Sequence, residues 1–247
     1  MTNETLHLPA TVAEREAMAD ELNRRFADGS PEALLRYMTE AFRGRIALSS
    51  SLSLEDQVLT DMLCGIDKQT RVFTLDTGRM FPETYNLIDR TNERYGIQIE
   101  VFFPDFQKVE EMVRTHGINL FYSSVELRHL CCNTRKIEPL HRALRGLDVW
   151  VCGLRRAQSP TRTSMRMVEY DAADGMLKLN PIIEWSEAQT RAYVKEHAVP
   201  YNKLHDRGFP SIGCQPCTRA VEAGEDIRSG RWWWEDPNHR ECGLHSR

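Results

Sequence analysis

RIALSSSLSLEDQVLTDMLCGIDKQTRVFTLDTGR, residues 45–79, contains one complete strand–helix–strand pattern. Its apolar runs predict a strand over 45–50, a helix over 54–63 and a second strand over 71–75. A helix that connects two neighbouring strands forms a right-handed crossover and leaves the strands parallel. The stretch therefore predicts a parallel α/β sheet.

The same alternation continues toward the C-terminus, where a hairpin is expected around the turn AADG at 172–175. Repeated strand–helix units place helices on both faces of a sheet, so we expect a mostly parallel, doubly wound α/β fold. The N-terminal part is predicted to be helical, since Ser30-Pro31-Glu32 supplies an N-cap, a proline at the first helical position and an acidic first turn. The further expected elements are helices over 82–95, 105–115, 133–145 and 187–197, and strands over 97–103, 148–152, 165–170 and 176–179.

Three segments are expected along the chain. Residues 1–44 form N-terminal helices, residues 45–205 form an α/β domain, and residues 206–247 form a segment rich in glycine, proline, cysteine and arginine. Hydrophobic periodicity fades in the last segment, so we expect it to close over the sheet without being an independent domain. Its end is expected to be a mobile C-terminal tail.

The composition excludes several classes of protein. The 247 residues are 41% hydrophobic and 28% charged, which is typical of a globular chain and unlike a disordered or collagen-like one. No run approaches the roughly 18 apolar residues that a membrane helix needs, and the N-terminus lacks the pattern of a secretory signal. A net charge of −4 argues against broad nucleic-acid binding. Seven cysteines in such a chain predict a cytoplasmic protein in a reducing environment.

Two polar loops follow the first two predicted strands. The serine-rich loop SSSLSLED (49–56) runs from strand into helix, where hydroxyls, backbone N–H groups and the helix N-terminus suit phosphate or sulfate. LDTGR (75–79) follows the next strand, and its glycine lets the backbone approach a ligand closely. Ligands bind at the carboxyl ends of parallel strands, so the two loops favour a nucleotide pocket over simple capping turns. The glycine patterns of Walker nucleotide triphosphatases and Rossmann dehydrogenases do not occur in the sequence.

Arginines gather in a third loop, GLRRAQSPTR (153–162), which follows the strand expected over 148–152. Such a loop is a candidate clamp for phosphate or sulfate, although a charged loop is usually only solvated. A second basic cluster near the C-terminus contains Arg228, Arg231, His239 and Arg240. Either cluster could bind one small anion.

The cysteines form the most specific pattern. A C-x-x-C at Cys214 and Cys217 can bring two thiolates onto one metal, and the distant pair Cys131-Cys132 can complete four ligands. Four such ligands fit structural zinc or an iron–sulfur cluster, and the directly adjacent pair favours the cluster, because zinc sites usually take two C-x-x-C-like halves. Lys136 falls four residues after Cys132, where its charge would partly offset that of a thiolate-bound cluster.

The other three cysteines differ from one another. Cys64 and Cys152 fall inside a predicted helix and strand and are expected to be small buried hydrophobic residues. Cys242 lies in RECGLH (240–245), five residues from the end of the chain. The neighbouring arginine and histidine would favour its thiolate, which is the nucleophilic form. Cys242 is therefore a candidate nucleophile.

The serine-rich loop, LDTGR, GLRRAQSPTR, the two cysteine pairs and the terminal ECGLH lie between about residue 45 and the end of the chain. Together they resemble the assimilatory adenosine 5′-phosphosulfate (APS) reductases, the iron–sulfur branch of the phosphoadenylyl-sulfate reductase family. LDTGR and ECGLH are specific to the family, and the cysteine quartet is specific to the branch. The resemblance implies an adenine-nucleotide α-hydrolase-like fold, a 4Fe-4S cluster and thioredoxin as the reductant.

The resemblance also implies roles for individual residues. Ser53 and Leu54 stand where glycine and alanine are frequent in the family, so residue assignments in the serine-rich loop stay open. The cluster would be bound by Cys131, Cys132, Cys214 and Cys217. The catalytic group would comprise the nucleophile Cys242, Lys136, which would link cluster and substrate electrostatically, and His245. The nucleotide and sulfate site would be lined by Ser50, Ser51, Leu75, Thr77, Arg79, Gly153, Arg162, Arg228, Arg231 and His245.

The reaction implied is a thioredoxin-dependent reduction of APS to sulfite and AMP through an S-sulfocysteine on Cys242, as part of sulfate assimilation. The closest alternative is a 3′-phosphoadenosine 5′-phosphosulfate (PAPS) reductase with the same mechanism, a branch that typically lacks the cysteine quartet. An ATP pyrophosphatase or tRNA-thiolating enzyme would carry an S-G-G-x-D-S loop, which the sequence does not match. A zinc-stabilised binding module would leave LDTGR and Cys242 without a role. Neither nucleic acid nor membrane is an expected partner, and a homo-oligomer stays open.

Overall fold

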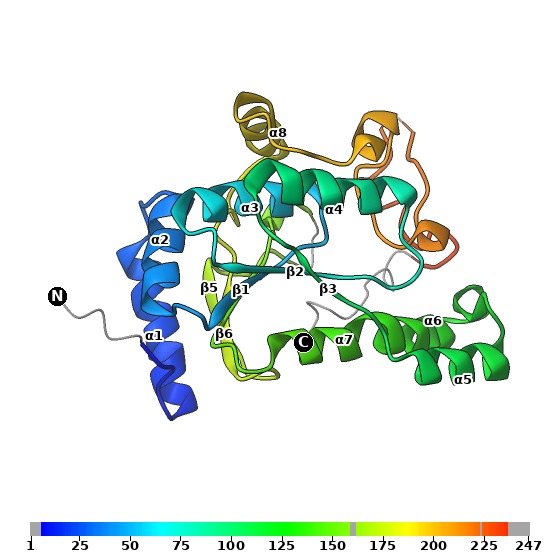
Figure 1. Ribbon diagram of the computed structural model, residues 1–247, viewed down its shortest axis with the longest axis horizontal. Helices are drawn as coiled ribbons and strands as arrows, with labels where there is room; N and C mark the ends of the chain where they lie inside the picture. Colours follow the sequence, from blue (N-terminus) through cyan, green and yellow to red (C-terminus); the bar gives the residue numbers. More distant parts are fainter. Residues whose placement is uncertain (1–5, 159–161, 223, 237–247) are drawn as a thin grey trace. The chain divides into compact units, whose positions relative to one another are not determined.

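The computed structural model describes residues 6–158, 162–222 and 224–236 (Figure 1). The chain divides into two compact units, each built from three separate stretches. Unit 1 consists of Met1–Phe73, Leu87–Glu100 and Leu144–Tyr201, and unit 2 consists of Thr74–Asn86, Val101–Ala143 and Asn202–Arg247. The division into 1–44, 45–205 and 206–247 expected from the sequence stays a prediction.

A six-stranded sheet has the order β3-β2-β1-β4-β6-β5. β1 pairs in parallel with β2 and with β4, and β4 pairs in parallel with β6, while β5 runs antiparallel to β6 as the predicted hairpin. The mostly parallel sheet expected from the sequence is therefore confirmed. The strands are β1 (Ile46–Ser49), β2 (Arg71–Leu75), β3 (Glu100–Phe102), β4 (Val149–Val151), β5 (Val168–Asp171) and β6 (Met176–Leu179).

The central strands are short and apolar because both faces of a parallel sheet are covered. Ala47, Leu48, Val149 and Val151 are fully buried. Strands buried on both faces appear in the sequence as continuous apolar runs, which is the pattern that predicted them.

The helices of unit 1 begin at the caps that the sequence indicates. Ser30 caps α2 by accepting a hydrogen bond from the Ala33 N–H at 3.2 Å. Figure 1 shows α3 and α4 along one face of the sheet, and the buried Gln57 amide of α3 donates to the Thr91 hydroxyl of α4 at 2.8 Å. The elements of unit 1 are α1 (Val12–Arg25), α2 (Pro31–Ala41), α3 (Leu54–Ile66), α8 (Glu187–Glu196) and the 3-10 turn η3 (Arg156–Gln158), and α4 (Pro82–Tyr95) enters it from unit 2.

Unit 2 contains a helical segment whose beginning the sequence did not predict correctly. The helix expected over 133–145 begins earlier, at Val125, where Ser124 caps it. It passes through the adjacent cysteines, widens into one π-helical turn and then continues as an α-helix. The elements of unit 2 are α5 (Phe106–His116), η1 (Leu120–Tyr122), α6 (Val125–Cys132), the π-turn η2 (Asn133–Ile137), α7 (Glu138–Leu144), η5 (Lys203–Arg207) and η6 (Gln215–Cys217).

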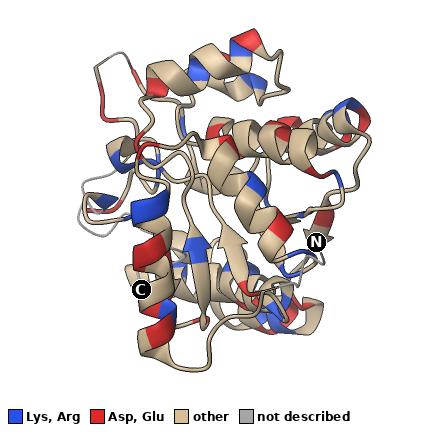
Figure 2. Ribbon diagram, turned by 90° about the vertical axis from the view of Figure 1, so that its left-hand side faces the viewer, with Lys and Arg blue, Asp and Glu red and all other residues tan. Residues whose placement is uncertain are grey.

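Acidic and basic segments alternate along the helices that Figure 2 draws, in keeping with the small net charge. Within the described part of the chain, no helix is both long enough and apolar enough to cross a bilayer.

Candidate active site

The strand order reverses between β1 and β4. From β1 the chain adds β2 and β3 on one side, and it then crosses back to place β4 on the other side of β1. The loops that leave two such neighbouring strands diverge and open a crevice, which is where doubly wound sheets bind their ligands. The serine-rich loop follows β1, and the loop that begins near Gly153 follows β4.

One carboxylate joins these two loops. Oδ2 of Asp56, in the first turn of α3, accepts from the Ser51 N–H at 2.7 Å and from the Ser51 hydroxyl at 2.6 Å. Its Oδ1 accepts from the Gly153 N–H at 3.1 Å. Asp56 thus fixes Ser51 and Gly153, two of the residues predicted from the resemblance, at the same edge of the sheet.

Burial sets the protonation of this carboxylate. Asp56 is only 5% exposed, and the loss of hydration raises its pKa to about 6, although the hydrogen bonds from Ser51 oppose the rise. A Cβ on Gly153 would come within 2.2 Å of Asp56 Oδ1, so this position accommodates only glycine. Leu52, between the serines, has a φ of 61°, a left-handed conformation that is strained for a leucine.

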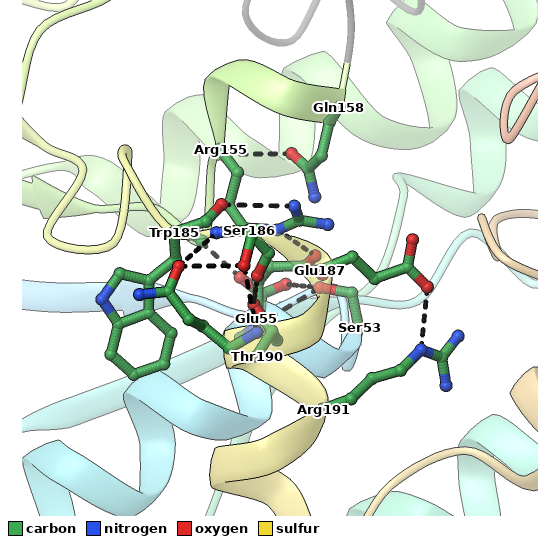
Figure 3. Close-up of polar contacts among 12 residues, drawn as sticks. Ser53, Glu55, Arg155, Gln158, Trp185, Ser186, Glu187, Thr190 and Arg191 are labelled. Carbon is green, nitrogen blue, oxygen red and sulfur yellow. Dashed lines mark hydrogen bonds and ion pairs between the residues drawn. The ribbon is translucent and has the colours of Figure 1, made fainter.

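The GLRRAQSPTR loop is braced from within unit 1. Arg155 Nε donates to Glu55 Oε1 at 2.8 Å, and both side chains are buried. Figure 3 shows Arg155 between Gln158 and Trp185, where its Nη1 lies 3.4 Å from the Trp185 carbonyl oxygen. Arg156 is paired with Glu184. Arg155 and Arg156 are thus paired with carboxylates of the protein, and the three-arginine clamp stays a prediction.

Arg162 is the third arginine of that loop. It is 8% exposed and donates to the side chain of Gln158, which in turn accepts from the Arg155 N–H at 3.1 Å. Ser50, also buried, accepts from the Leu52 N–H at 3.1 Å. The predicted residues Ser50, Ser51, Gly153 and Arg162 of unit 1 are thus each hydrogen-bonded within the loops that follow β1 and β4.

In unit 2 the LDTGR loop is attached to the C-x-x-C turn. The Thr77 hydroxyl lies 3.3 Å from Cys214 Sγ, and the Gln215 N–H donates to the Arg79 carbonyl at 2.8 Å. Arg135, from the π-turn, donates to the Thr77 carbonyl at 2.6 Å. The half-buried Leu75 ends β2 just before this loop. Two motifs that lie 137 residues apart in sequence are therefore in direct contact.

Arg79 itself is used to hold the loop. Its guanidinium donates to the Asn119 side chain at 3.1 Å and to the Ile118 carbonyl at 2.5 Å, and it lies over the Phe121 ring. These contacts make Arg79 a structural bridge between LDTGR and the chain before α6.

The two cysteine pairs share one environment in unit 2. Cys131, Cys214 and Cys217 all contact a core cluster that includes Phe121 and Trp232. Burial, with smaller contributions from the neighbouring Cys214 and Cys132, raises the pKa of Cys217 to about 12. All six cysteines in the described residues are free thiols.

Cationic side chains border these thiols. Burial raises the pKa of Cys131, and the Arg135 guanidinium opposes the rise. The charges of Arg231 and Lys136 likewise oppose the rise in the pKa of Cys217. Four neighbouring thiols with cations beside them have the donor chemistry of an anionic thiolate-bound metal centre. Within the described residues, however, no three metal-binding side chains form a group that could hold a metal ion, so the four-cysteine ligand set stays a proposal.

The C-terminal basic residues have different environments. Arg231 is 7% exposed and reaches the Ser211 hydroxyl and the Cys217 carbonyl, each at 3.4 Å. A Cβ on Gly213 would come within 2.3 Å of its guanidinium, so that glycine makes room for it. Arg228 is half-buried. The predicted catalytic residues Cys242 and His245 lie outside the described residues, as do His239 and Arg240.

Sequence reasoning missed two side chains of these sites, Asp56 and Arg135. Asp56 could have been found as the acid that follows the serine-rich loop in the first helical turn. Arg135 carries no local signal, because its partner Thr77 lies 58 residues away in sequence.

Comparisons with known proteins agree with this geometry. Residues 45–220 match the phosphoadenosine phosphosulfate reductase domain. The chain is 49% identical over 214 residues to the adenosine 5′-phosphosulfate reductase of Burkholderia cepacia, a match that covers 87% of this chain and 85% of the relative. It is 46% identical over 235 residues to the enzyme of the same name from Sinorhizobium fredii, covering 95% and 93% of the two chains.

Solved structures show the same fold. The phosphoadenylyl-sulfate reductase of Candida auris, in complex with phosphate, has a TM-score of 0.73 at 27% identity and covers 87% of this chain and 100% of its own. The FMN adenylyltransferase of Candida glabrata, with a TM-score of 0.56 at 17% identity over 88% and 73% of the chains, is similar in fold alone. The resemblance stated from the sequence motifs is confirmed. The chain is a member of the phosphoadenosine phosphosulfate reductase family.

Proposed function

We propose that this protein reduces APS to sulfite and AMP in sulfate assimilation, with thioredoxin as the electron donor. The observation that carries the proposal is the contact between Thr77 of LDTGR and Cys214 of the C-x-x-C turn, which joins the nucleotide motif to the cysteine quartet. The relatives named adenosine 5′-phosphosulfate reductase support the choice of APS. The free thiols support a reducing, cytoplasmic location.

Each unit carries groups that suit an anionic nucleotide substrate. In unit 1, the loops joined by Asp56 present serine hydroxyls and backbone N–H groups at the N-terminus of α3, which suit an anionic oxygen. In unit 2, Thr77, Lys136, Arg228 and Arg231 would contribute polar and cationic groups. We propose Ser50, Ser51, Leu75, Thr77, Gly153, Arg162, Arg228, Arg231 and His245 as substrate-binding residues, and Arg79 as a residue that supports them.

The chemistry requires one reactive thiol. The Cys242 thiolate attacks the sulfur of the sulfate group, the bond from that sulfur to the bridging oxygen breaks, and AMP leaves with the electron pair. A thioredoxin thiolate then attacks the Cys242 sulfur and releases sulfite. The second thioredoxin thiol resolves the mixed disulfide, so two thiols supply both electrons and lose two protons. Lys136 and the arginines would neutralise the substrate's charge, which otherwise repels the thiolate.

A 4Fe-4S cluster would be held by Cys131, Cys132, Cys214 and Cys217. When bound, it would supply an anionic centre, and the electrons for the reaction would still come from thiols. The protein's own contribution is the set of cations around the four thiols, with Lys136 and Arg231 next to Cys217 and Arg135 next to Cys131.

Anaerobically purified protein is expected to contain four iron atoms and four acid-labile sulfides per chain. Replacement of Cys214 by serine should abolish both, because a hydroxyl is a poor substitute for a thiolate ligand. Cys64→Ser is the matched control, since Cys64 lies within α3 of unit 1, and it should retain the iron. One zinc ion per chain and no sulfide would contradict the proposed cofactor.

The choice between APS and PAPS is tested by competition. Anaerobic protein with reduced thioredoxin should form sulfite with a much larger kcat/KM for APS than for PAPS. PAPS is tested because the fold is also similar to that of a phosphoadenylyl-sulfate reductase. Equal values, or a preference for PAPS, would overturn the substrate and leave the thiol chemistry unchanged.

Asp56 is expected to control substrate affinity. Asp56→Asn places an amide N–H₂ against the donors of Ser51 and Gly153, so the Kd for APS should rise roughly ten- to hundred-fold, the cost of about 1.5–3 kcal/mol for a charged hydrogen bond. Because its pKa is raised to about 6, the wild-type Asp56 carboxyl gains a proton as the pH falls from 7 to 5. The affinity of the wild-type protein for APS should therefore fall over the same pH range.

Calorimetric titration at several pH values measures both effects. The variant should lack the wild-type pH dependence. Asp61→Asn is the control, because Asp61 lies on the same helix but accepts from Tyr95 and Tyr193 at 2.9 and 2.8 Å. An unchanged Kd in Asp56→Asn would show that the two loops need no carboxylate between them.

A further inference from the structure

Three aromatic side chains of unit 2, Tyr122, Trp233 and Trp234, form a continuous surface that we call the aromatic patch. The rings of Tyr122 and Trp234 meet edge to face with centroids 4.4 Å apart, and those of Trp233 and Trp234 with centroids 4.8 Å apart. Tyr122 is 44% exposed and Trp233 is 37% exposed. Single exposed apolar residues are common, whereas contiguous aromatic rings at a surface are typical of a binding site.

The patch is held firmly to the cysteine region. The Tyr122 hydroxyl donates to the Pro216 carbonyl, inside the C-x-x-C turn, at 2.7 Å. Trp234 packs against the core cluster that contains Phe121 and Cys217. The next residue, Glu235, forms a buried ion pair with Arg128 at 2.7 Å. Rings held in place before binding lose little conformational entropy when a partner covers them.

The distance along the chain to the proposed nucleophile restricts which partner can use this surface. Asp236 lies six residues before Cys242, and six residues span at most about 20 Å. Any protein whose thiolate attacks the Cys242 sulfur must therefore reach to within that distance of Asp236, and Trp233 and Trp234 lie inside this range because they are three and two residues before Asp236. Tyrosine and tryptophan are also the residues that contribute most to binding energy in protein interfaces.

We propose that the aromatic patch is the docking surface for the protein dithiol that reduces the sulfonated Cys242, a proposal that rests on the function proposed above. The partner's chemistry is that of a small protein with two reactive thiols and an apolar surface beside them. The patch forms and breaks no bond. It holds the partner while one thiolate displaces sulfite from Cys242 and the second closes the partner's disulfide.

The test uses Trp233→Ala in the full-length, anaerobically prepared protein. With saturating APS, kcat/KM for reduced thioredoxin should fall about ten-fold or more, because the exposed part of the ring would contact the docked partner. The Cys242 adduct formed from APS alone, measured by mass spectrometry, should be unchanged. Sulfite release from that adduct by dithiothreitol should also be unchanged, since a small thiol needs no docking surface.

Phe106→Ala is the matched control. Phe106 is a 67% exposed aromatic residue at the first position of α5 in the same unit, and it lies outside the aromatic patch. All four rates should stay at the wild-type value in this variant: adduct formation, dithiothreitol release, and turnover with low and with high thioredoxin.

Three results would overturn the proposal. Trp233→Ala and wild type could show the same kcat/KM for thioredoxin. Release by dithiothreitol could fall in parallel, which would place the effect on the Cys242 segment itself. Sedimentation could show a changed oligomeric state, which would make the patch a contact between copies of this chain. A failure of the proposed function is distinguishable, because wild-type protein would then form no adduct with APS at all.

Discussion

A Cys242→Ser variant is expected to form no sulfite from APS, while it still binds APS and retains its iron. A serine hydroxyl is not ionised near neutral pH and cannot form the disulfide that thioredoxin exchanges. This thiol is neither among the proposed substrate-binding residues nor among the four proposed cluster ligands. A variant that loses sulfite formation but keeps its affinity for APS would therefore identify Cys242 as the nucleophile and not as a substrate-binding residue.

Mass spectrometry of the wild-type protein mixed with APS alone should show one added sulfonate on the peptide that contains Cys242. The buried cysteines supply the control. Burial raises the pKa of Cys64 to about 11 and that of Cys152 still further, so both remain neutral thiols near pH 7. Cys64→Ala should thus retain sulfite formation. An adduct on Cys64 or Cys152, or sulfite from Cys242→Ser, would rule out the assignment.

The parallel sheet could be predicted because its strands carry their information locally. The apolar run over 71–75 corresponds to β2, and the helix expected over 82–95 corresponds to α4. Caps such as Ser30 and Ser53 accept a hydrogen bond from the residue three positions later, so a short stretch of sequence is enough to predict them.

The helix around the adjacent cysteines shows where local information is insufficient. The stretch 125–132 has few strongly apolar residues, so its periodicity gives little signal, and the π-turn after it depends on packing. Arg135 occupies that turn because its guanidinium reaches the Thr77 carbonyl in unit 2. A contact across that sequence distance leaves no pattern in either stretch.

The same limit applies to the arginines. The sequence places Arg155 in a loop with the composition of an anion clamp, and the structure pairs it with Glu55, 100 residues away. Which arginines remain for a substrate depends on which ones the protein's own carboxylates bind. Arg162, whose buried side chain donates to Gln158, stays a predicted ligand of the substrate.

Removal of either partner of the Arg128–Glu235 ion pair is expected to lower the free energy of unfolding by about 3–5 kcal/mol, because the remaining charge is buried and loses the charged partner that lies 2.7 Å from it. The Arg128 and Glu235 side chains are 0% and 4% exposed, and the Arg128 guanidinium lies 4.7 Å from the centre of the Trp232 ring. Anaerobic urea denaturation of Arg128→Met and Glu235→Gln measures the loss.

The double variant Arg128→Met/Glu235→Leu tests the cause. If uncompensated charge accounts for the loss, replacing both partners with apolar side chains should restore much of the stability, since a buried ion pair gains little over well-packed apolar residues. Arg219→Met is the control for an exposed pair: its partner Glu225 lies 3.0 Å away, both side chains are more than a third exposed, and the cost should be below about 1 kcal/mol. If the double variant loses as much unfolding free energy as the two single variants together, the loss comes instead from the packing around Trp232. Residues 232–236 would then be held in place by aromatic contacts and not by charge.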